Sequence, residues 1–147
     1  MAIVGDFGVD NANERAVADL IAAWDADHVV TVGDNNYVGG GAADADRVIG
    51  KYYARWISPY LGSYGPGSTT GNRFWPALGN HDWDPPGGVA WHLDYFALPH
   101  NERYYDVRLG AAHFIILDSD PREPDGVTWD SVQADWAREA AARVDAP

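Results

Sequence analysis

The first third of the chain combines two short apolar runs with one stretch of helical spacing. The runs "AIVG" (2–5) and "HVVTVG" (28–33) have the length and character of buried strands. Residues 12–24 predict a helix, with Asn11 or Asn13 as the N-cap. The apolar positions of that helix recur at helical spacing: Ala16, Val17, Leu20, Ile21 and Trp24. A strand, a helix and a second strand in this order predict a parallel βαβ unit.

The middle of the chain alternates between helical and irregular patterns. Residues 46–61 predict a helix that stops near Pro59, and a Gly-rich loop, "VGGGAAD", precedes it. The composition of 62–72 is that of a surface loop. Residues 73–80, "RFWPALGN", predict a third strand that ends in a polar turn. After the break at "WDPPGG", residues 89–98 predict one or two helical turns.

The last third predicts an antiparallel hairpin and a helix. Residues 103–120 contain two strand-like runs joined by a tight "LGA" turn. The second run, "HFIILD", has the continuous apolar character of a buried central strand. Residues 128–144 predict a helix with Asp130 or Ser131 as cap. A βαβ start followed by a hairpin indicates an α/β fold with mixed β-sheet layers flanked by helices.

Length, charge and composition narrow the class of protein. The 147 residues suit a single domain, 1–147, and no repeat or linker divides them. A net charge of −12 leaves no basic patch, so we expect no binding to a nucleic-acid backbone. The chain has no cysteine, which excludes disulfides and thiolate ligands. No apolar run is long enough to cross a membrane, and the compartment stays open.

Three apolar runs end in polar turns, "GDFG", "GDNNY" and "GNHD". In open α/β sheets, ligands bind beyond the carboxyl ends of the strands. Three neighbouring strands would therefore bring a set of polar side chains to one edge of the sheet, and a glycine before each lets the backbone turn. The set consists of Asp6, Asp34, Tyr37, Asn80 and His81.

The chemistry of this set suits hard cations. Carboxylate, amide and phenolate oxygens are ligands for such ions, and His81 adds a nitrogen ligand or a proton carrier. Two metals roughly 3.5–4 Å apart form the clamp used for displacement at phosphorus. The structural alternatives are simple: Asp6 and Asp34 can be turn formers after glycine, and Tyr37 can be a half-buried aromatic residue.

The ordered set "GDFG … GDNNY … GNHD" resembles the first three blocks of the calcineurin-like metallophosphoesterases. It is most similar to the purple-acid-phosphatase branch, which has Asp-x-Gly in the first block and a Tyr three residues after the second Asp. Asp6-Phe7-Gly8 and the pair Asp34 and Tyr37 match both features. The later stretch "ILDSDPREPDG … QADW" is similar to bacterial members of this branch. The resemblance implies a metallophosphatase-type fold.

The resemblance also implies roles for individual residues. Asp6 would bind the first metal, Asp34 would bridge both metals, and Tyr37 would be a phenolate ligand of the first ion, normally iron. Asn80 would bind the second metal, which is Zn, Mn or Fe. His81 would face the phosphate or its leaving oxygen, and the attacking group would be a metal-bound hydroxide.

Two further implications concern the neighbouring aspartate and the substrate. Asp82 would lie behind the ligands and orient His81. The substrate would be a phosphate ester, and the reaction would be phosphomonoester hydrolysis. Members of this family are often exported.

The family has two further blocks, Val-x-x-His and Gly-His-x-His, and neither is found in residues 1–147. We therefore expect the N-terminal half of a catalytic domain, truncated after the helix that ends near residue 144. The first metal would lack one His and the second two, so weak or partial metal occupancy is expected. The alternative is a catalytically incompetent domain that assembles or binds metal. The exposed edge of "HFIILD" would favour a homo-oligomer or a complementing C-terminal half.

The other histidines and two late aspartates have simpler interpretations. Structural roles are expected for three of the histidines, and His100 is a loop residue that could face a pocket. The two aspartates end an apolar run, where capping and turn roles are expected. The residues with these structural assignments are His28, His92, His113, Asp118 and Asp120.

Overall fold

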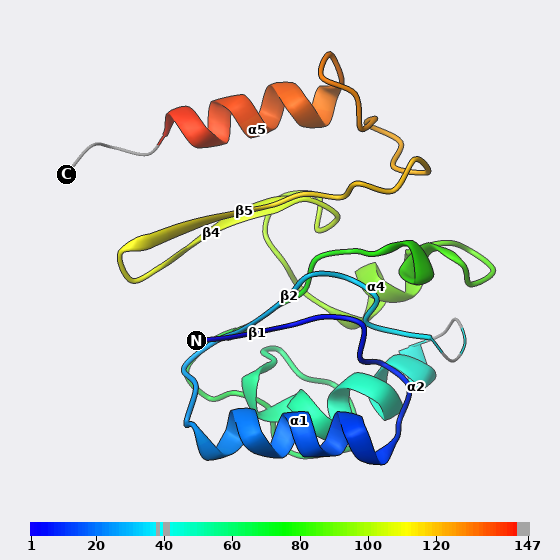
Figure 1. The fold of residues 1–147 in the computed structure, drawn as a ribbon, viewed down its shortest axis with the longest axis vertical. Coiled ribbons are helices and arrows are strands. Elements are labelled where there is room, and N and C mark those ends of the chain that lie inside the picture. Colours follow the sequence, from blue (N-terminus) through cyan, green and yellow to red (C-terminus); the bar gives the residue numbers. More distant parts are fainter. Residues whose placement is uncertain (38, 40–41, 144–147) are drawn as a thin grey trace.

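A parallel sheet forms the layer that carries the candidate residues. The computed structural model describes residues 1–37, 39 and 42–143. Strands β1 (Ala2–Val4), β2 (Val29–Thr31) and β3 (Phe74–Trp75) pair in the order β1-β2-β3, all parallel. Helix α1 (Ala12–Ala23) connects β1 to β2 and lies along one face of this sheet (Figure 1). The predicted βαβ unit is confirmed.

Helix α1 begins where its cap predicts, but it buries a narrower face. The Asn11 side chain accepts hydrogen bonds from the backbone N–H groups of Asn13 and Glu14, so Asn11 is the N-cap. Ile21 is buried, whereas the other large members of the expected apolar stripe are exposed. Glu14 is buried in their place, because its carboxylate accepts hydrogen bonds from the loop before the helix. The exposed members of the stripe are Val17, Leu20 and Trp24.

The second helical segment begins earlier and ends earlier than the predicted 46–61. It consists of four short pieces in continuous succession, and its last helical residue is Trp56 rather than a residue near Pro59. Val48, Ile49 and Tyr53 of this segment are fully buried. The expected loop "VGGGAAD" lies partly outside the described residues. The pieces are α2 (Ala42–Ala45), the π-helix η1 (Asp46–Gly50), α3 (Lys51–Tyr53) and the 3-10 helix η2 (Ala54–Trp56).

The third strand is much shorter than the predicted 73–80. Only Phe74–Trp75 pair with β2, and the chain then turns into the 3-10 helix η3 (Asn80–Trp83). Helix α4 (Ala90–Tyr95) follows, within the predicted 89–98. A short β3 brings the "GNHD" segment close to the sheet edge.

The predicted hairpin forms a separate two-stranded sheet. Strand β4 (Tyr105–Leu109) pairs with β5 (Ala112–Ile116), and Gly110 takes a positive φ of 63° in the tight turn between them. The prediction that this second strand is central and buried is wrong. In the described part of the chain β5 pairs with β4 alone, and Ala112 is exposed.

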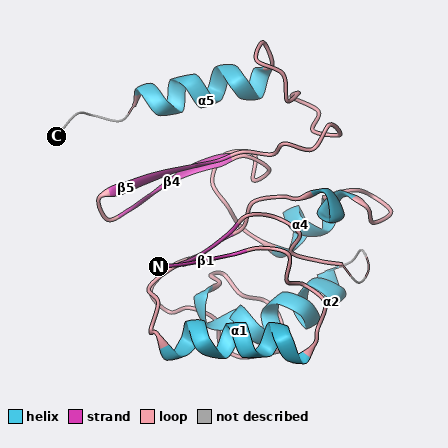
Figure 2. Ribbon diagram, in the orientation of Figure 1, coloured by secondary structure: helices cyan, strands magenta, loops and turns pink. Residues whose placement is uncertain are grey.

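Helix α5 (Val132–Ala142) packs against the outer face of the hairpin (Figure 2). Ser131 is its N-cap, because the Ser131 side chain accepts a hydrogen bond from the N–H of Ala134. The predicted helix 128–144 therefore begins later than expected, and residue 144 lies outside the described residues. The arrangement is the predicted α/β fold with mixed β-sheet layers flanked by helices.

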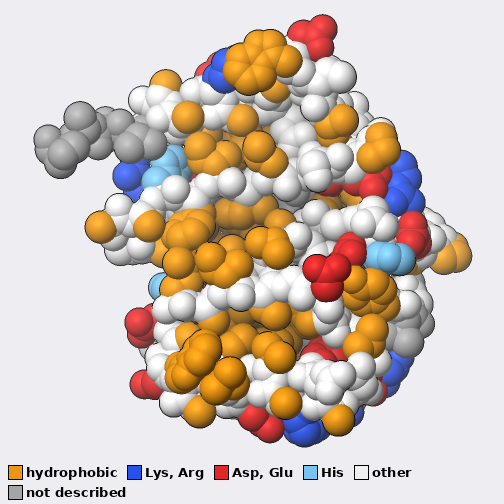
Figure 3. Space-filling view, in the orientation of Figure 1, with side chains coloured by type: hydrophobic (Ala, Val, Ile, Leu, Met, Phe, Trp, Pro, Cys, Tyr) orange, Lys and Arg blue, Asp and Glu red, His pale blue; other side chains and the backbone are white. Residues whose placement is uncertain are grey.

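The two sheets have separate hydrophobic clusters. The larger cluster lies between the parallel sheet, α1 and the second helical segment, and it includes Tyr53, Trp56 and Phe74. The smaller one, which includes Trp75 and Tyr105, lies between the parallel sheet and the hairpin. Figure 3 shows further hydrophobic side chains at the surface, over the strands and α1, with acidic side chains and a histidine where β1 and β2 end.

Candidate metal centre

Backbone contacts bring the three polar turns together at the carboxyl edge of the parallel sheet. The N–H of Asp6 donates to the carbonyl of Gly33 at 3.2 Å, and the N–H of Phe7 donates to the carbonyl of Asp34 at 3.3 Å. The N–H of His81 donates to Asp34 Oδ1 at 3.0 Å. The turn after β2 is therefore bonded to both of its neighbours.

Left-handed backbone conformations aim the two carboxylates into this edge. Asp6 and Asp34 have φ values of 54° and 55°, which is uncommon for residues with a side chain. Gly33 turns the chain with a φ of 103°. Gly79 is extended, and its role is close approach: a Cβ there would lie 2.3 Å from Asp34 Oδ1. The expectation of a glycine turn before each polar residue therefore holds at Gly33 and not at Gly79.

Gly8 places the loop that carries Tyr37. A Cβ on Gly8 would lie 1.7 Å from the carbonyl oxygen of Asn35, so only glycine fits against this loop. The carbonyl of Gly8 accepts a hydrogen bond from the N–H of Tyr37 at 2.9 Å. The Asp-x-Gly and Asp-x-x-Tyr features of the sequence are thus parts of one contact.

The Tyr37 hydroxyl joins the two carboxylates. It lies 3.0 Å from Asp6 Oδ1 and 3.0 Å from Asp34 Oδ2. Burial raises the pKa of Tyr37, and hydrogen bonds to Asp34 and Asp6 raise it further. In the described part of the chain, no Lys or Arg forms an ion pair with either aspartate. Three oxygens from two turns therefore converge with no cationic side chain among them.

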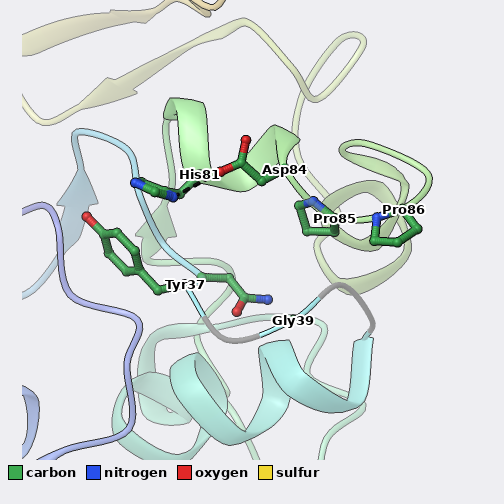
Figure 4. Close-up of a pocket in the computed structure, with 7 residues that line it drawn as sticks. Tyr37, Gly39, His81, Asp84, Pro85 and Pro86 are labelled. Atoms are coloured by element: carbon green, nitrogen blue, oxygen red, sulfur yellow. Dashed lines mark ion pairs between the residues drawn. The ribbon is translucent and has the colours of Figure 1, made fainter.

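His81 lies beside this group of oxygens. Its ring centroid is 4.5 Å from that of Tyr37, and its Nδ1 is 3.0 Å from Asp84 Oδ2. Figure 4 shows the two rings side by side in a pocket of about 280 Å³ that Pro85 and Pro86 close on the far side. The ring is half-exposed, so it is accessible to a ligand.

Residues 1–134 match the calcineurin-like phosphoesterase family. The chain belongs to the calcineurin-like phosphoesterase family. Membership implies phosphate esters as substrates, and members of the family typically bind two metal ions. No curated protein matches this phosphoesterase. Among the residues described, no helix is both long and apolar enough to cross a bilayer.

Asp82 of this phosphoesterase is buried and bonds to backbone rather than to the His81 ring. Its Oδ1 accepts from the N–H groups of Asn35 and Asn36 at 2.9 and 3.1 Å, and its Oδ2 accepts from the N–H of Gly79 at 2.8 Å. The Asn35 side-chain amide donates a fourth hydrogen bond. Burial raises the pKa of Asp82 to about 6. The geometry thus connects Asp82 to both turns, while Asp84 contacts the histidine ring.

Asn80 is exposed and lines a second hollow beside the oxygens. This hollow, of about 440 Å³, is also bordered by Asp6, Asp34 and Asp120. The carbonyl of Asn80 accepts a hydrogen bond from Arg122 at 2.7 Å. The sequence-predicted residues therefore lie around one edge: Asp6, Asp34 and Tyr37 meet directly, Asn80 and His81 flank them, and Asp82 lies behind.

Sequence reasoning missed Asp84 and Arg122. Asp84 is three residues after His81, a spacing that puts two side chains on one face of a helical turn. Arg122 is far away in the chain, in "DPREPDG", and the only available signal was the similarity of that stretch to bacterial members of the branch.

The donor set of this phosphoesterase fits one hard cation better than two. Asp6, Asp34 and Tyr37 present three convergent oxygens, which suits an ion such as iron once the phenol loses its proton. For a second ion, only Asp34 and Asn80 border the same hollow. Among the described residues, no group of three or more His, Cys, Asp or Glu could hold a metal.

The remaining histidines lie away from this edge in structural contacts. His92 is fully buried, and burial lowers its pKa to about 4. His28 contacts the indole N–H of Trp75, while His100 and His113 both contact Asp106 at 2.7 Å. Asp118 accepts a hydrogen bond from the N–H of Asp120, the turn contact expected of it.

Proposed function

We propose that this phosphoesterase is purple-acid-phosphatase-like and hydrolyses phosphate monoesters at a binuclear metal centre. The observation that carries the proposal is the position of the Tyr37 hydroxyl, 3.0 Å from a carboxylate oxygen of both Asp6 and Asp34. A tyrosine so placed is the feature of this branch in the resemblance. The Gly8 contact that places the tyrosine supports the same assignment.

Each proposed ligand has its own place in the site. Asp6, Asp34 and Tyr37 would hold an iron ion, and Asp34 with Asn80 would hold a second ion, Zn, Mn or Fe. When bound, such ions supply Lewis-acid polarisation of the phosphate and a nucleophile at neutral pH. The orientation of the Asp34 carboxylate is fixed because its Oδ1 accepts a hydrogen bond from the N–H of His81.

In the proposed reaction His81 supplies a proton to the leaving oxygen. The P–O bond to the alcohol breaks as a new P–O bond forms to the oxygen of water, which releases one proton to the solvent. A protonated His81 donates from Nε2 to the departing oxygen, while its Nδ1 stays paired with the Asp84 carboxylate. Asp82 would act on the histidine through the backbone, because it holds Gly79 in place two residues earlier.

The proposal treats 1–147 as one metallophosphoesterase domain, the N-terminal half of a catalytic domain. The further metal ligands would then come from outside residues 1–147, from a complementing C-terminal half or from another copy of the chain. For residues 1–147 we expect tight binding of at most one ion and weak binding of the second.

The alternative is a domain that binds a metal or phosphate without turnover. The shortage of a third carboxylate or imidazole among the described residues favours it. Metal stoichiometry alone does not separate the two functions, because both predict at least one bound ion. Turnover separates them.

The test combines metal analysis with hydrolysis of p-nitrophenyl phosphate. We expect the chain loaded with iron and zinc to bind at least one ion and to release p-nitrophenol. Asp34→Asn should lose the ion and about 100-fold or more of the activity, because the shared carboxylate loses its charge. Asp19→Asn, at an exposed position of α1, is the matched control. Metal binding without any turnover would favour the alternative, and an unchanged Asp34→Asn would refute the site.

A further inference from the structure

Arg122 connects the loop after β5 to the turn that carries His81. Its Nη1 donates to Asp84 Oδ1 at 3.1 Å, and its Nη2 donates to the carbonyl of Asn80 at 2.7 Å. On the other side, Nε and Nη2 donate to the two carboxylate oxygens of Asp120 at 2.8 and 2.9 Å. One guanidinium therefore joins both ends of η3 to a loop of the second sheet.

Asp84 carries this connection to the histidine ring. One of its oxygens contacts Arg122, and the other lies 3.0 Å from His81 Nδ1. Because a carboxylate only accepts hydrogen bonds, Asp84 favours the ring form of His81 that has its proton on Nδ1. The opposite ring nitrogen points away from Asp84, to the side of the pocket where the Tyr37 hydroxyl lies (Figure 4).

The loop that carries Arg122 is itself held in place. Asp118 Oδ1 accepts from the N–H of Asp120, and Asp120 Oδ1 accepts from the N–H of Arg122, both at 2.9 Å. The Gln133 side chain bonds the N–H and the carbonyl of Asp118 at 2.8 and 2.9 Å. Trp83, within η3, donates its indole N–H to Asp118 Oδ2 at 2.9 Å. The loop and η3 are thus bonded at two points.

A second ion-pair cluster holds the next residue of the same loop. Arg103 donates to both carboxylate oxygens of Glu123, at 2.9 and 3.1 Å, and the Glu123 side chain is fully buried. Glu123 directly follows Arg122 in the chain. The backbone on either side of Arg122 therefore has little freedom, and the guanidinium starts from a fixed base.

An isolated surface ion pair contributes little to stability, so the exposure of Arg122 alone would suggest no role. The comparison with Arg138 shows the difference. Both side chains are about equally exposed, 43% and 41%, and each pairs with an aspartate. Arg138, however, pairs with an aspartate of its own helix. Asp120 is almost buried, and the contact chain from it ends on His81.

We propose that Arg122, acting through Asp84, is a positioning residue that orients the His81 ring toward the leaving oxygen of the substrate. This inference rests on the proposed phosphatase function. A carboxylate bonded only to His81 could swing with the ring, since Asp84 is itself half-exposed. With Arg122 on its second oxygen, the carboxylate is fixed, and the ring nitrogen opposite is held on the side of the Tyr37 hydroxyl (Figure 4).

The kinetic test compares substrates with poor and good leaving groups. In the metal-loaded chain, Arg122→Gln should lower kcat for phenyl phosphate by about 10- to 100-fold, the size of effect expected from a misplaced catalytic group. The loss should be less than about threefold for 2,4-dinitrophenyl phosphate, whose departing oxygen needs little proton transfer. KM and metal content should stay the same. A general loss of structure would lower both rates together.

Two further variants sharpen the kinetic test. Arg122→Lys keeps the charge but cannot bond Asp120, Asn80 and Asp84 at once, so we expect an intermediate loss with the same dependence on leaving group. Arg138→Gln removes an equally exposed arginine without touching the chain of contacts, and it should leave both rates unchanged. Equal losses for both substrates in Arg122→Gln would overturn the inference.

A second measurement is independent of turnover. At a pH where His81 is neutral, two-bond ¹H–¹⁵N spectra report which ring nitrogen carries the proton, with His81→Asn for assignment. We expect the Nδ1–H form in the unmodified chain and a mixture of both forms in Arg122→Gln. If the chain has no phosphatase activity, the proposed function fails. The spectra still show whether Arg122, through Asp84, orients the His81 ring. An unchanged His81 spectrum in Arg122→Gln would refute that role.

Discussion

The two sheets of this phosphoesterase use polar residues in different ways. Among the described residues, no cationic side chain pairs with the oxygens at the carboxyl edge of the parallel sheet, where Asp6 and Asp34 adopt positive φ values and share one tyrosine hydroxyl. The segments on either side of the hairpin sheet bear charges that are paired, as in the contacts of Arg103 with Glu123 and of Arg122 with Asp120. The oxygens at the edge of the parallel sheet can therefore bind a cation, whereas the charges around the hairpin are already paired.

The difference teaches how the site is built from two layers. Two aspartates at positive φ are unfavourable for folding, and these conformations persist because the surrounding structure determines them. The ion pairs of Arg122 in the loop after β5 restrict the motion of Asp84, which lies beside the site. The proposed proton donor, His81, therefore lies beside the parallel sheet, and Arg122 contacts its partner Asp84 from the loop after the hairpin.

The largest expected effect comes from closing the space at Gly8. Gly8→Ala would place a methyl group 1.7 Å from the carbonyl of Asn35. We expect the free energy of unfolding to fall by about 4 kcal/mol, with metal binding lost because Tyr37 moves. Urea unfolding and metal analysis measure the two effects.

Gly71→Ala is the control for the Gly8 substitution. Gly71 has a positive φ of 93° but no heavy atom within 4 Å of a Cβ. Its substitution should cost about 1 kcal/mol through backbone strain alone. Equal losses in the two variants would mean that the Gly8 contact does not order the site.

The next effect concerns the buried carboxylate behind the site. Asp82→Ala would remove the acceptor of the N–H groups of Asn35, Asn36 and Gly79, the first two of them in buried hydrogen bonds. We expect a loss of about 3 kcal/mol in the free energy of unfolding. Asp19→Ala, on the surface of α1, should change it by less than about 0.5 kcal/mol. A similar small change in both would show that Asp82 is not a structural link between the turns.

A pH effect distinguishes the parallel layer further. Burial raises the pKa of Glu14 from 4.5 to about 7. The folded state therefore holds this proton more tightly, and the resulting stability is full below about pH 4.5 and lost as pH rises through about 7. Glu14→Gln should remove about 3 kcal/mol of this fall between pH 4 and pH 8.

Urea unfolding across that pH range gives the slope directly. Glu139→Gln changes an exposed glutamate of α5 and should leave the slope as it is in the unmodified chain. A slope that survives in Glu14→Gln would contradict the assignment, and the buried Asp82 and Asp118 would then be its source.

The smallest effect compares the caps of two helices, one in each layer. Asn11→Ala and Ser131→Ala each remove the side chain that caps a helix, and each should cost about 1 kcal/mol. The Ser131 change should lower the hydrogen-exchange protection of α5 and leave that of β1 and β2 intact. The Asn11 change should lower protection in α1. Uniform loss across both layers in both variants would show that the layers unfold only together.

Much of the parallel layer could be predicted from the sequence, because local patterns determine it. Apolar runs ended by Gly-Asp and Gly-Asn indicated the strand ends, and the order of the runs indicated the parallel pairing. The start of α2 at Ala42 could not be predicted, because the Gly-rich stretch before it is typical of a loop. The short β3 was also missed, because the pairing of only Phe74 and Trp75 depends on the neighbouring strand and not on their own pattern.

The candidate site was predictable where its residues follow strands and unpredictable where it depends on distant contacts. Asp6, Asp34 and Tyr37 stood out because polar groups after buried strands converge. Arg122 contacts Asp84 across 38 positions of sequence, and no local spacing indicates such a pair. The role of Asp82 was also hidden, because its four hydrogen bonds go to turns that come together only in the fold.

The central claim is that Asp6, Asp34 and Tyr37 together hold one metal ion, and a ferric titration followed by visible absorption tests it most directly. We predict a tyrosinate-to-iron band that saturates at one ion per chain, is absent in Tyr37→Phe, and is unchanged in Tyr64→Phe, which alters an exposed tyrosine. No band in the unmodified chain, or an equal band in Tyr37→Phe, would contradict the account.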